Sequence, residues 1–198
     1  MSHIGVFLDR DGTINQEVDY LRSPDDLRLL EGAAAGIREL NQCGCRVFVI
    51  TNQSGIARGL LTEQQLDAIH QKLRTELKAE NAYLDAIYYC PHHPEGNQPY
   101  RMVCDCRKPN TGMIDRAVKE FQVDIKQSFV VGDRLLDIQT GKNVGAQTIL
   151  VLTGYGKQEL QYCRDHNVQI DFVAENLYDA VTHIKNVIHC EPHNTSSK

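Results

Sequence analysis

The sequence predicts an α/β fold, in which a parallel sheet is covered by helices on both faces. Short apolar runs alternate with amphipathic segments along most of the chain, which is the pattern of parallel strands joined by crossover helices. Several of the apolar runs end in polar or acidic residues. No internal repeat, linker or domain break divides the chain. We therefore expect one Rossmann-like domain over residues 1–190.

The strands are predicted from compact apolar runs, as in buried parallel strands. The helices are predicted from apolar residues at helical spacing, most clearly after Thr62, which forms a capping box with Gln65. The polar residues 191–198 are expected to form a disordered tail. In chain order, the expected strands lie at 4–8, 46–50, 86–89, 129–131, 148–152 and 171–173, and the expected helices at 33–42, 62–77, 112–121, 135–144, 158–166 and 177–188.

Composition excludes several classes of function. The 198 residues are 41% hydrophobic and 24% charged, which are ordinary values for a globular protein. The net charge is −5 without a basic cluster, so nucleic acid is not an expected partner. No stretch is apolar for the length of a membrane span, and a strand beginning at Ile4 leaves no room for a signal peptide. We expect a cytoplasmic protein that acts without a membrane.

The first strand ends in two carboxylates, Asp9 and Asp11, followed by Gly12. Residues two apart on an extended backbone face the same way, so both carboxylates can converge on one point. Two crowded acids repel each other unless a cation lies between them, and hard oxygen ligands favour Mg²⁺. The strand end therefore predicts a magnesium site, although a solvated acidic turn is the alternative for this motif taken alone.

Two other strands end in polar residues, Thr51 and Asn52 after the second and Asp133 after the fourth. In parallel α/β sheets, ligands bind outside the carboxyl ends of the strands. Asp9 would attack phosphorus, while Asp11 would protonate the leaving group and later deprotonate water. Asp9, Asp133 and the backbone carbonyl of Asp11 would hold Mg²⁺. Thr51 and Lys108 would stabilise the transferred phosphoryl group.

Each of these strand ends could separately be an ordinary turn or helix cap. Their occurrence together, each at the end of a strand, favours a phosphate-transfer site over a set of unrelated turns.

Three cysteines and a histidine crowd into one loop, at Cys90, His92, Cys104 and Cys106. Three thiolates and one imidazole suit tetrahedral zinc, and a complete protein shell indicates a structural site. From spacing alone, His93 competes with His92 as the fourth ligand.

The other cysteines are not expected to form a disulfide framework, because the loop cluster and the odd total of seven point to a reducing compartment. Cys43, Cys45 and Cys163 are interpreted as free thiols. His189, Cys190 and His193 could bind a metal adventitiously, but we interpret them as part of a frayed tail.

Residues 9–13, 51–52, 108 and 132–133, together with Asp137, resemble the four motifs of phosphatases of the haloacid dehalogenase superfamily. The likeness is closer still to the bacterial D-glycero-D-manno-heptose 1,7-bisphosphate phosphatases. It covers about residues 4–156 and is carried by the segments 51–59, 88–96 and 104–109.

This resemblance implies a Mg²⁺-dependent phosphoric monoester hydrolase with structural Zn²⁺. It would remove the C7 phosphate of the heptose bisphosphate through an aspartyl-phosphate, feeding nucleotide-activated heptose (ADP-heptose) synthesis for the lipopolysaccharide core. The roles above carry over to Asp9, Asp11, Thr51 and Lys108, and His92 is favoured over His93. The implied substrate-binding residues are Glu17, Val18, Asp19, Tyr20, Asn52, Gln53, Ser54, Arg107 and Arg134.

Arg134 stands where related proteins often have lysine, which keeps the charge but changes its geometry. The gaps at 10–32 and 90–110 are too short for a cap domain, so specificity is expected to come from loops around an open cleft. The expected partner is a small-molecule sugar bisphosphate, and the chain is expected to act as a monomer. Two alternatives remain, a histidinol-phosphate phosphatase and a non-catalytic, zinc-stabilised sugar-phosphate-binding module.

Overall fold

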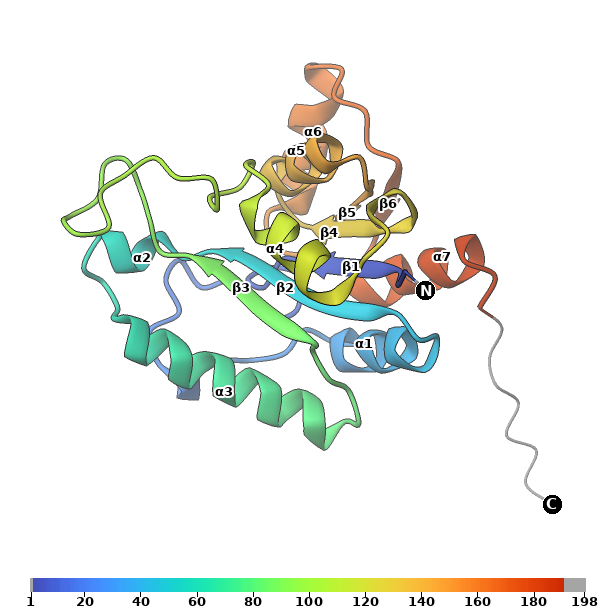
Figure 1. Ribbon diagram of the computed structural model, residues 1–198, viewed down its shortest axis with the longest axis horizontal. Helices are drawn as coiled ribbons and strands as arrows, with labels where there is room; N and C mark the ends of the chain where they lie inside the picture. Colours follow the sequence, from blue (N-terminus) through green and yellow to red (C-terminus); the bar gives the residue numbers. More distant parts are fainter. Residues whose placement is uncertain (1, 191–198) are drawn as a thin grey trace.

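A computed structural model describes residues 2–190 (Figure 1). The six strands form one parallel sheet in the order β3-β2-β1-β4-β5-β6. The predicted α/β class is confirmed. The strands are β1 (Gly5–Leu8), β2 (Arg46–Asn52), β3 (Ala86–Cys90), β4 (Phe129–Gly132), β5 (Gln147–Val151) and β6 (Phe172–Ala174).

Helices cover both faces of this sheet (Figure 1). Strand residues alternate between the faces, so that Val6 and Leu8 of β1 pack on one side and Phe7 on the other. Helices α1, α3 and α7 cover the Val6 side, and α4 packs on the Phe7 side with α5 and α6 beside it. The helices are α1 (Ala33–Gln42), α2 (Ser54–Ala57), α3 (Glu63–Ala79), α4 (Gly112–Phe121), α5 (Leu135–Val144), α6 (Gly156–Asp165) and α7 (Leu177–Val187).

The predicted elements agree with these bounds to within about two residues, with informative differences at the strand ends. β2 continues to Asn52 because Thr51 and Asn52 pair with the last two residues of β3. The predicted capping box at the start of α3 is present, with Thr62 and Gln65 bonded reciprocally. The short helix α2 is not among the predicted elements, because a single turn carries no periodic signal.

The connections that could hold an extra domain are short. Residues 9–32, between β1 and α1, contain one 3₁₀ helix (Pro24–Asp26), and residues 91–111, between β3 and α4, contain no helix or strand. The prediction of a fold without a cap domain is confirmed. Among residues 2–190, no helix is long and apolar enough to span a membrane.

One prediction about the cysteines is wrong. Cys43, at the end of α1, and Cys190, after α7, form a disulfide. The sequence indicates a free thiol and part of a frayed tail instead, because 147 residues separate the two cysteines and only the packing of α1 against α7 brings them together. Cys45 and Cys163 are free thiols, as predicted, and the structure places both in buried positions. His193 and the predicted tail at 191–198 lie outside the described residues.

Candidate active site

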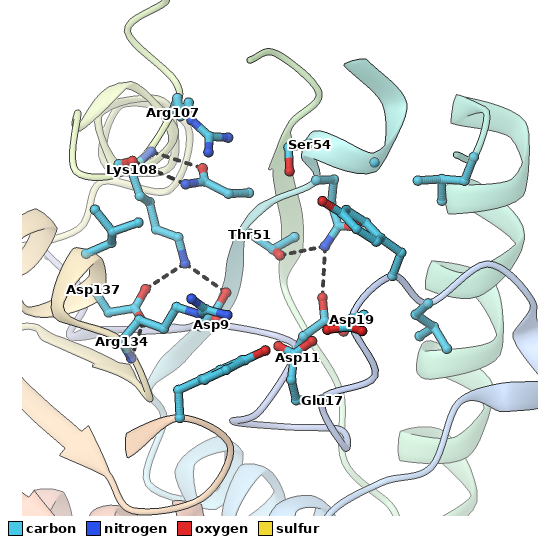
Figure 2. A pocket seen from close by; sticks show the side chains of 18 residues that line it. Asp9, Asp11, Glu17, Asp19, Thr51, Ser54, Arg107, Lys108, Arg134 and Asp137 are labelled. Carbon is cyan, nitrogen blue, oxygen red and sulfur yellow. Dashed lines mark hydrogen bonds and ion pairs between the residues drawn. The ribbon is translucent and has the colours of Figure 1, made fainter. Parts of the chain in front are cut away.

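A cleft of about 330 Å³ lies at the carboxyl edge of the sheet (Figure 2). Its walls come from the ends of β1, β2 and β4, the segments 17–21 and 53–61, the loop after β3 and the segment after β5. All predicted catalytic and substrate-binding residues line it except Val18, which is 41% exposed. The lining residues are Asp9, Asp11, Glu17, Asp19, Tyr20, Leu21, Thr51, Asn52, Gln53, Ser54, Gly55, Leu61, Arg107, Lys108, Arg134, Leu136, Asp137 and Tyr155.

A buried lysine joins two carboxylates at the floor of the cleft. Nζ of Lys108 donates to Oδ1 of Asp9 at 2.7 Å and to Oδ1 of Asp137 at 2.6 Å (Figure 2). Its third donor goes to the carbonyl oxygen of Ile50 at 2.9 Å. Burial lowers the pKa of Lys108, but the two carboxylates outweigh this effect and hold the pKa above its usual value. Lys108 is therefore a fixed cation beside Asp9.

Asn52 fixes the backbone that carries this lysine. Its Oδ1 accepts from the amide of Lys108 at 3.0 Å, and its Nδ2 donates to the carbonyl of Lys108 at 3.2 Å. The amide side chain is a planar pair of one donor and one acceptor, so it can bind the backbone N–H and the backbone carbonyl of the same residue. Asn52 is predicted to bind substrate, and the structure places its polar atoms on Lys108 instead.

Asp11 faces the cleft with its other sides occupied. Its oxygens accept from Arg10, from Nδ2 of Asn15 at 2.9 Å and from Nε2 of Gln53 at 3.0 Å. Gln53 also donates to Oγ1 of Thr51 at 2.9 Å, which links Asp11 to the end of β2 (Figure 2). Burial raises the pKa of Asp11, but the Arg10 charge and these hydrogen bonds outweigh it, so the pKa lies below its usual value.

Asp133 lies completely buried behind the cleft, against Gly12. Gly12 has φ of +80°, and a Cβ there would collide with the Asp133 carboxylate, so only glycine fits. Oδ2 of Asp133 accepts from the amide of Tyr155 at 2.8 Å, and Oδ1 is buried without a partner. Such an orphaned carboxylate oxygen is costly unless a cation binds it.

Three buried carboxylates, Asp9, Asp133 and Asp137, have oxygens within 4.8 Å of one another. Burial and mutual repulsion raise the pKa of Asp9 to about 6, despite Lys108, and that of Asp133 to about 8. Lys108 and the amide of Arg134 occupy the two oxygens of Asp137. The residues with oxygen free for a hard cation are therefore Asp133 and Asp9, two of the predicted magnesium ligands.

The outer wall carries further charged groups. Arg134 stacks over the ring of Tyr155, with its guanidinium carbon 3.7 Å from the ring centroid. Glu17 lies near Asp11, and burial together with that negative charge raises its pKa to about 7. In Figure 2, Glu17 and Asp19 lie on the Asp11 side of the cleft, and Arg107 lies on the opposite side above Lys108.

Tyr155, Arg10 and His70 contribute to the site but are not among the site residues predicted from the sequence. Tyr155 follows β5, and the reasoning applied to the other strand ends would have pointed to it. Arg10 and His70 lie behind Asp11, where His70 is contributed by α3. A charged residue between two carboxylates of a strand end could have indicated Arg10, but no local signal marks His70.

The predicted cysteine and histidine cluster is assembled in the structure. Sγ of Cys104 lies 3.5 Å from Sγ of Cys90 and 3.3 Å from Sγ of Cys106, which lies 3.4 Å from Nδ1 of His92. Ligands around tetrahedral zinc lie about 3.8 Å apart, so this donor set fits the ion after a small expansion. His93 instead contacts Arg58 and the amide of Glu95.

The fold and the acidic cleft together define a HAD-like hydrolase. The family model of HAD-hydrolase-like proteins matches residues 105–180. Among solved structures, the D,D-heptose 1,7-bisphosphate phosphatase from B. bronchiseptica, complexed with magnesium and phosphate, superposes with a TM-score of 0.81. It is 34% identical, and the match covers 92% of this chain and 98% of that one.

Sequence relatives narrow this class. A D-glycero-beta-D-manno-heptose-1,7-bisphosphate 7-phosphatase of Haemophilus ducreyi is 38% identical over 93% of this chain and 100% of its own length. The Escherichia coli K12 protein of the same name is 44% identical over 75% of this chain and 79% of its own length. The chain belongs to the family of D-glycero-D-manno-heptose-1,7-bisphosphate 7-phosphatases.

Proposed function

We propose that this protein hydrolyses the phosphate on C7 of D-glycero-D-manno-heptose 1,7-bisphosphate and leaves the C1 phosphate in place. The single observation that carries this proposal is the similarity over nearly the whole chain to relatives named as 7-phosphatases of this substrate. The product would enter the synthesis of nucleotide-activated heptose, as the resemblance in sequence implies.

Asp9 is the proposed nucleophile. Lys108 engages Oδ1 of Asp9, and among the described residues no donor contacts Oδ2. Oδ2 is therefore available to attack phosphorus and form an aspartyl-phosphate. Lys108 and the hydroxyl of Thr51 lie where they can stabilise charge on the transferred group.

Asp11 is the proposed general acid and base. It would give a proton to the C7 oxygen as the phosphorus–oxygen bond breaks, and would recover a proton from the water that hydrolyses the aspartyl-phosphate. Arg10 holds the free carboxyl ionised, which suits the second step. An incoming phosphate adds negative charge beside Asp11 and favours the protonated form that the first step needs.

Asp9, Asp133 and the backbone carbonyl of Asp11 would hold Mg²⁺. The buried, unpartnered Oδ1 of Asp133 supports this assignment. Bound there, the cation would neutralise the crowded carboxylates and polarise the phosphoryl oxygens. Cys90, His92, Cys104 and Cys106 would hold a structural Zn²⁺ that orders the loop carrying Arg107 and Lys108.

Substrate recognition is assigned to the walls of the cleft. Arg107 and Arg134 offer cations for a second phosphate, and Glu17, Asp19, Tyr20 and Ser54 offer hydrogen-bonding groups for a sugar. Asn52 and Gln53 would act through the catalytic residues they contact. Val18 lies outside the cleft and receives no role in binding.

The decisive experiment compares phosphate release from the α and β anomers of the heptose bisphosphate, from heptose 1-phosphate and from histidinol phosphate, each with Mg²⁺. Phosphorus NMR of the product would identify which phosphate is lost. We expect rapid loss of the C7 phosphate from at least one anomer and little release from heptose 1-phosphate.

Faster turnover of histidinol phosphate would favour the alternative phosphatase. Failure to hydrolyse every substrate, including a nitrophenyl phosphate, would favour the non-catalytic binding module. The matched control is Asp9→Asn, which removes the proposed nucleophile and keeps the shape of the side chain.

A further inference from the structure

We propose that His70 and Arg10 are positioning residues for Asp11. The neutral imidazole of His70 orients the buried Arg10 guanidinium, and this guanidinium orients the Asp11 carboxylate. This inference rests on the proposed general acid and base role of Asp11. The proposed mechanism uses Arg10 only as the charge that keeps Asp11 ionised, and it assigns no task to His70.

Arg10 grips Asp11 through two of its nitrogens. Nε donates to Oδ1 at 3.0 Å, and Nη2 donates to Oδ1 at 2.9 Å and to Oδ2 at 2.6 Å. The Arg10 side chain has no exposed surface, whereas that of Asp11 is 19% exposed toward the cleft. A planar guanidinium bound in this way fixes both the position and the rotation of the carboxylate.

His70 supplies the acceptor that Arg10 would otherwise lack on its remaining side. Nη1 of Arg10 lies 3.2 Å from Nε2 of His70, and both side chains are buried. Arginine only donates, so Nε2 must be the unprotonated nitrogen of a neutral imidazole. Burial and the positive charges of Arg10 and Arg74 lower the pKa of His70 to about 3, with Asp11 acting in the opposite sense. The ring of Tyr89 packs against His70, at 5.8 Å between ring centroids.

The contact also connects two parts of the fold. Arg10 and Asp11 belong to the turn after β1, whereas His70 is on the inward face of α3. Helix α3 therefore acts as a rigid support for a charged group that lies below the cleft. An error of about 1 Å in the placement of a reacting group can cost about 10²-fold in rate. Loss of His70 should therefore lower the rate most for substrates whose leaving group must be protonated by Asp11.

The test uses a pair of substitutions that differ in one property. Oε1 of glutamine can occupy the place of Nε2 of histidine, so His70→Gln keeps the acceptor, whereas His70→Leu removes it and adds apolar volume. We expect His70→Leu to lower kcat/KM for a sugar or alkyl phosphate by about 10- to 100-fold. The loss should be only a few-fold for nitrophenyl phosphate, whose leaving group needs little protonation. His70→Gln should restore most of the activity.

A series of ring-substituted phenyl phosphates distinguishes a role in positioning Asp11 from a role in stability alone, because only the former should change the dependence of kcat/KM on the leaving-group pKa. We expect log kcat/KM to fall more steeply with leaving-group pKa in His70→Leu than in the wild type. Leu77→Ala, on the same face of α3 two turns away, is the control for lost packing, and it should lower the unfolding temperature without changing this slope.

An unchanged slope in a folded His70→Leu protein would overturn the inference, as would an equal loss of activity on all substrates. The comparison of aryl and alkyl phosphates can be made even if the wild type does not act on the heptose bisphosphate. Failure of the inference is therefore separate from failure of the proposed substrate.

Discussion

The ammonium group of Lys108 lies 2.7 Å from Oδ1 of Asp9, although the two residues are 99 positions apart in the chain. The same group lies 2.6 Å from Oδ1 of Asp137. One buried cation therefore offsets two buried carboxylates, and Asp133 adds a third acid nearby. The site holds an excess of negative charge that a divalent cation would relieve.

Asp9→Asn should abolish turnover while the protein stays folded. The amide cannot form the aspartyl-phosphate, so we expect a loss of at least about 10³-fold. It also removes one of the crowded charges, so the unfolding temperature should stay the same or rise. Phosphate release and thermal unfolding by circular dichroism measure the two effects. Asp26→Asn, the same change at an exposed position, should be active. Normal turnover by Asp9→Asn would contradict the assignment of the nucleophile.

Lys108→Met should destabilise the protein in a pH-dependent way. Without the lysine, Asp9 and Asp137 would be buried acids without a partner, and breaking a buried pair costs about 3–5 kcal/mol. The pKa of Asp9, already raised to about 6, should rise further. A buried carboxyl with a raised pKa destabilises the folded protein only when it is ionised. The loss in free energy of unfolding should therefore be small near pH 4 and grow as the pH rises through 6.

Urea unfolding of Lys108→Met at several pH values, with a chelator present, measures this effect. Lys126→Met, in an exposed 3₁₀ helix, is the control. A loss of stability that is largest at low pH would contradict the argument.

His70 should make the wild-type protein less stable in acid. Its pKa is about 3 in the folded protein and 6.5 in the reference state. Below pH 6.5 His70 binds a proton in the unfolded chain but not in the folded protein. The free energy of unfolding should therefore fall as the pH is lowered from 6.5 to about 3. The contribution of this group is at most about 1.4 kcal/mol per pH unit. His70→Gln should show a shallower dependence over the same range in urea unfolding. Identical profiles for the two proteins would show that His70 does not titrate in this way.

Cys106→Ser should separate the zinc loop from the sheet. Loss of one ligand should release one equivalent of zinc and leave residues 91–107 open to proteases, because the metal is expected to order this loop. Activity should fall by about 10²-fold, since Cys106 directly precedes Arg107 and Lys108. Metal analysis, limited proteolysis and phosphate release measure these three effects. Cys163→Ser changes a buried thiol outside the cluster and should keep the zinc. A zinc-free Cys106→Ser protein with normal kinetics would refute this coupling.

Reduction of the Cys43–Cys190 disulfide should lower stability without lowering activity. The bond closes a long loop, and constraining such a loop in the unfolded chain contributes about 2–5 kcal/mol. Cys43 lies at the end of α1 that precedes β2, at the edge of the sheet opposite the cleft. Urea unfolding and phosphate release with and without a reductant measure the effect. Cys190→Ser should behave as the reduced protein in both assays, and an active protein with unchanged stability would contradict the prediction.

The sequence by itself determined the α/β class and the edge of the sheet that carries the site. Apolar runs and helical periodicity are local properties, so the strands and helices could be predicted closely. Parallel strands end at the same edge, and for this reason the sequence alone places Asp9, Thr51 and Asp133 together. The spacing of the cysteines in one loop predicted the donor set of the metal cluster in the same way.

Only the tertiary structure decided which side chains meet. Local patterns contain no information on the direction in which a side chain points across the fold, so His92 rather than His93 enters the cluster without a signal from spacing. Asn52 turns to the backbone of Lys108, and Val18 stays outside the cleft. The Cys43–Cys190 disulfide and the contact between Arg10 and His70 join segments that only helix packing brings together. Such contacts depend on the packing of whole elements, which no stretch of neighbouring residues specifies.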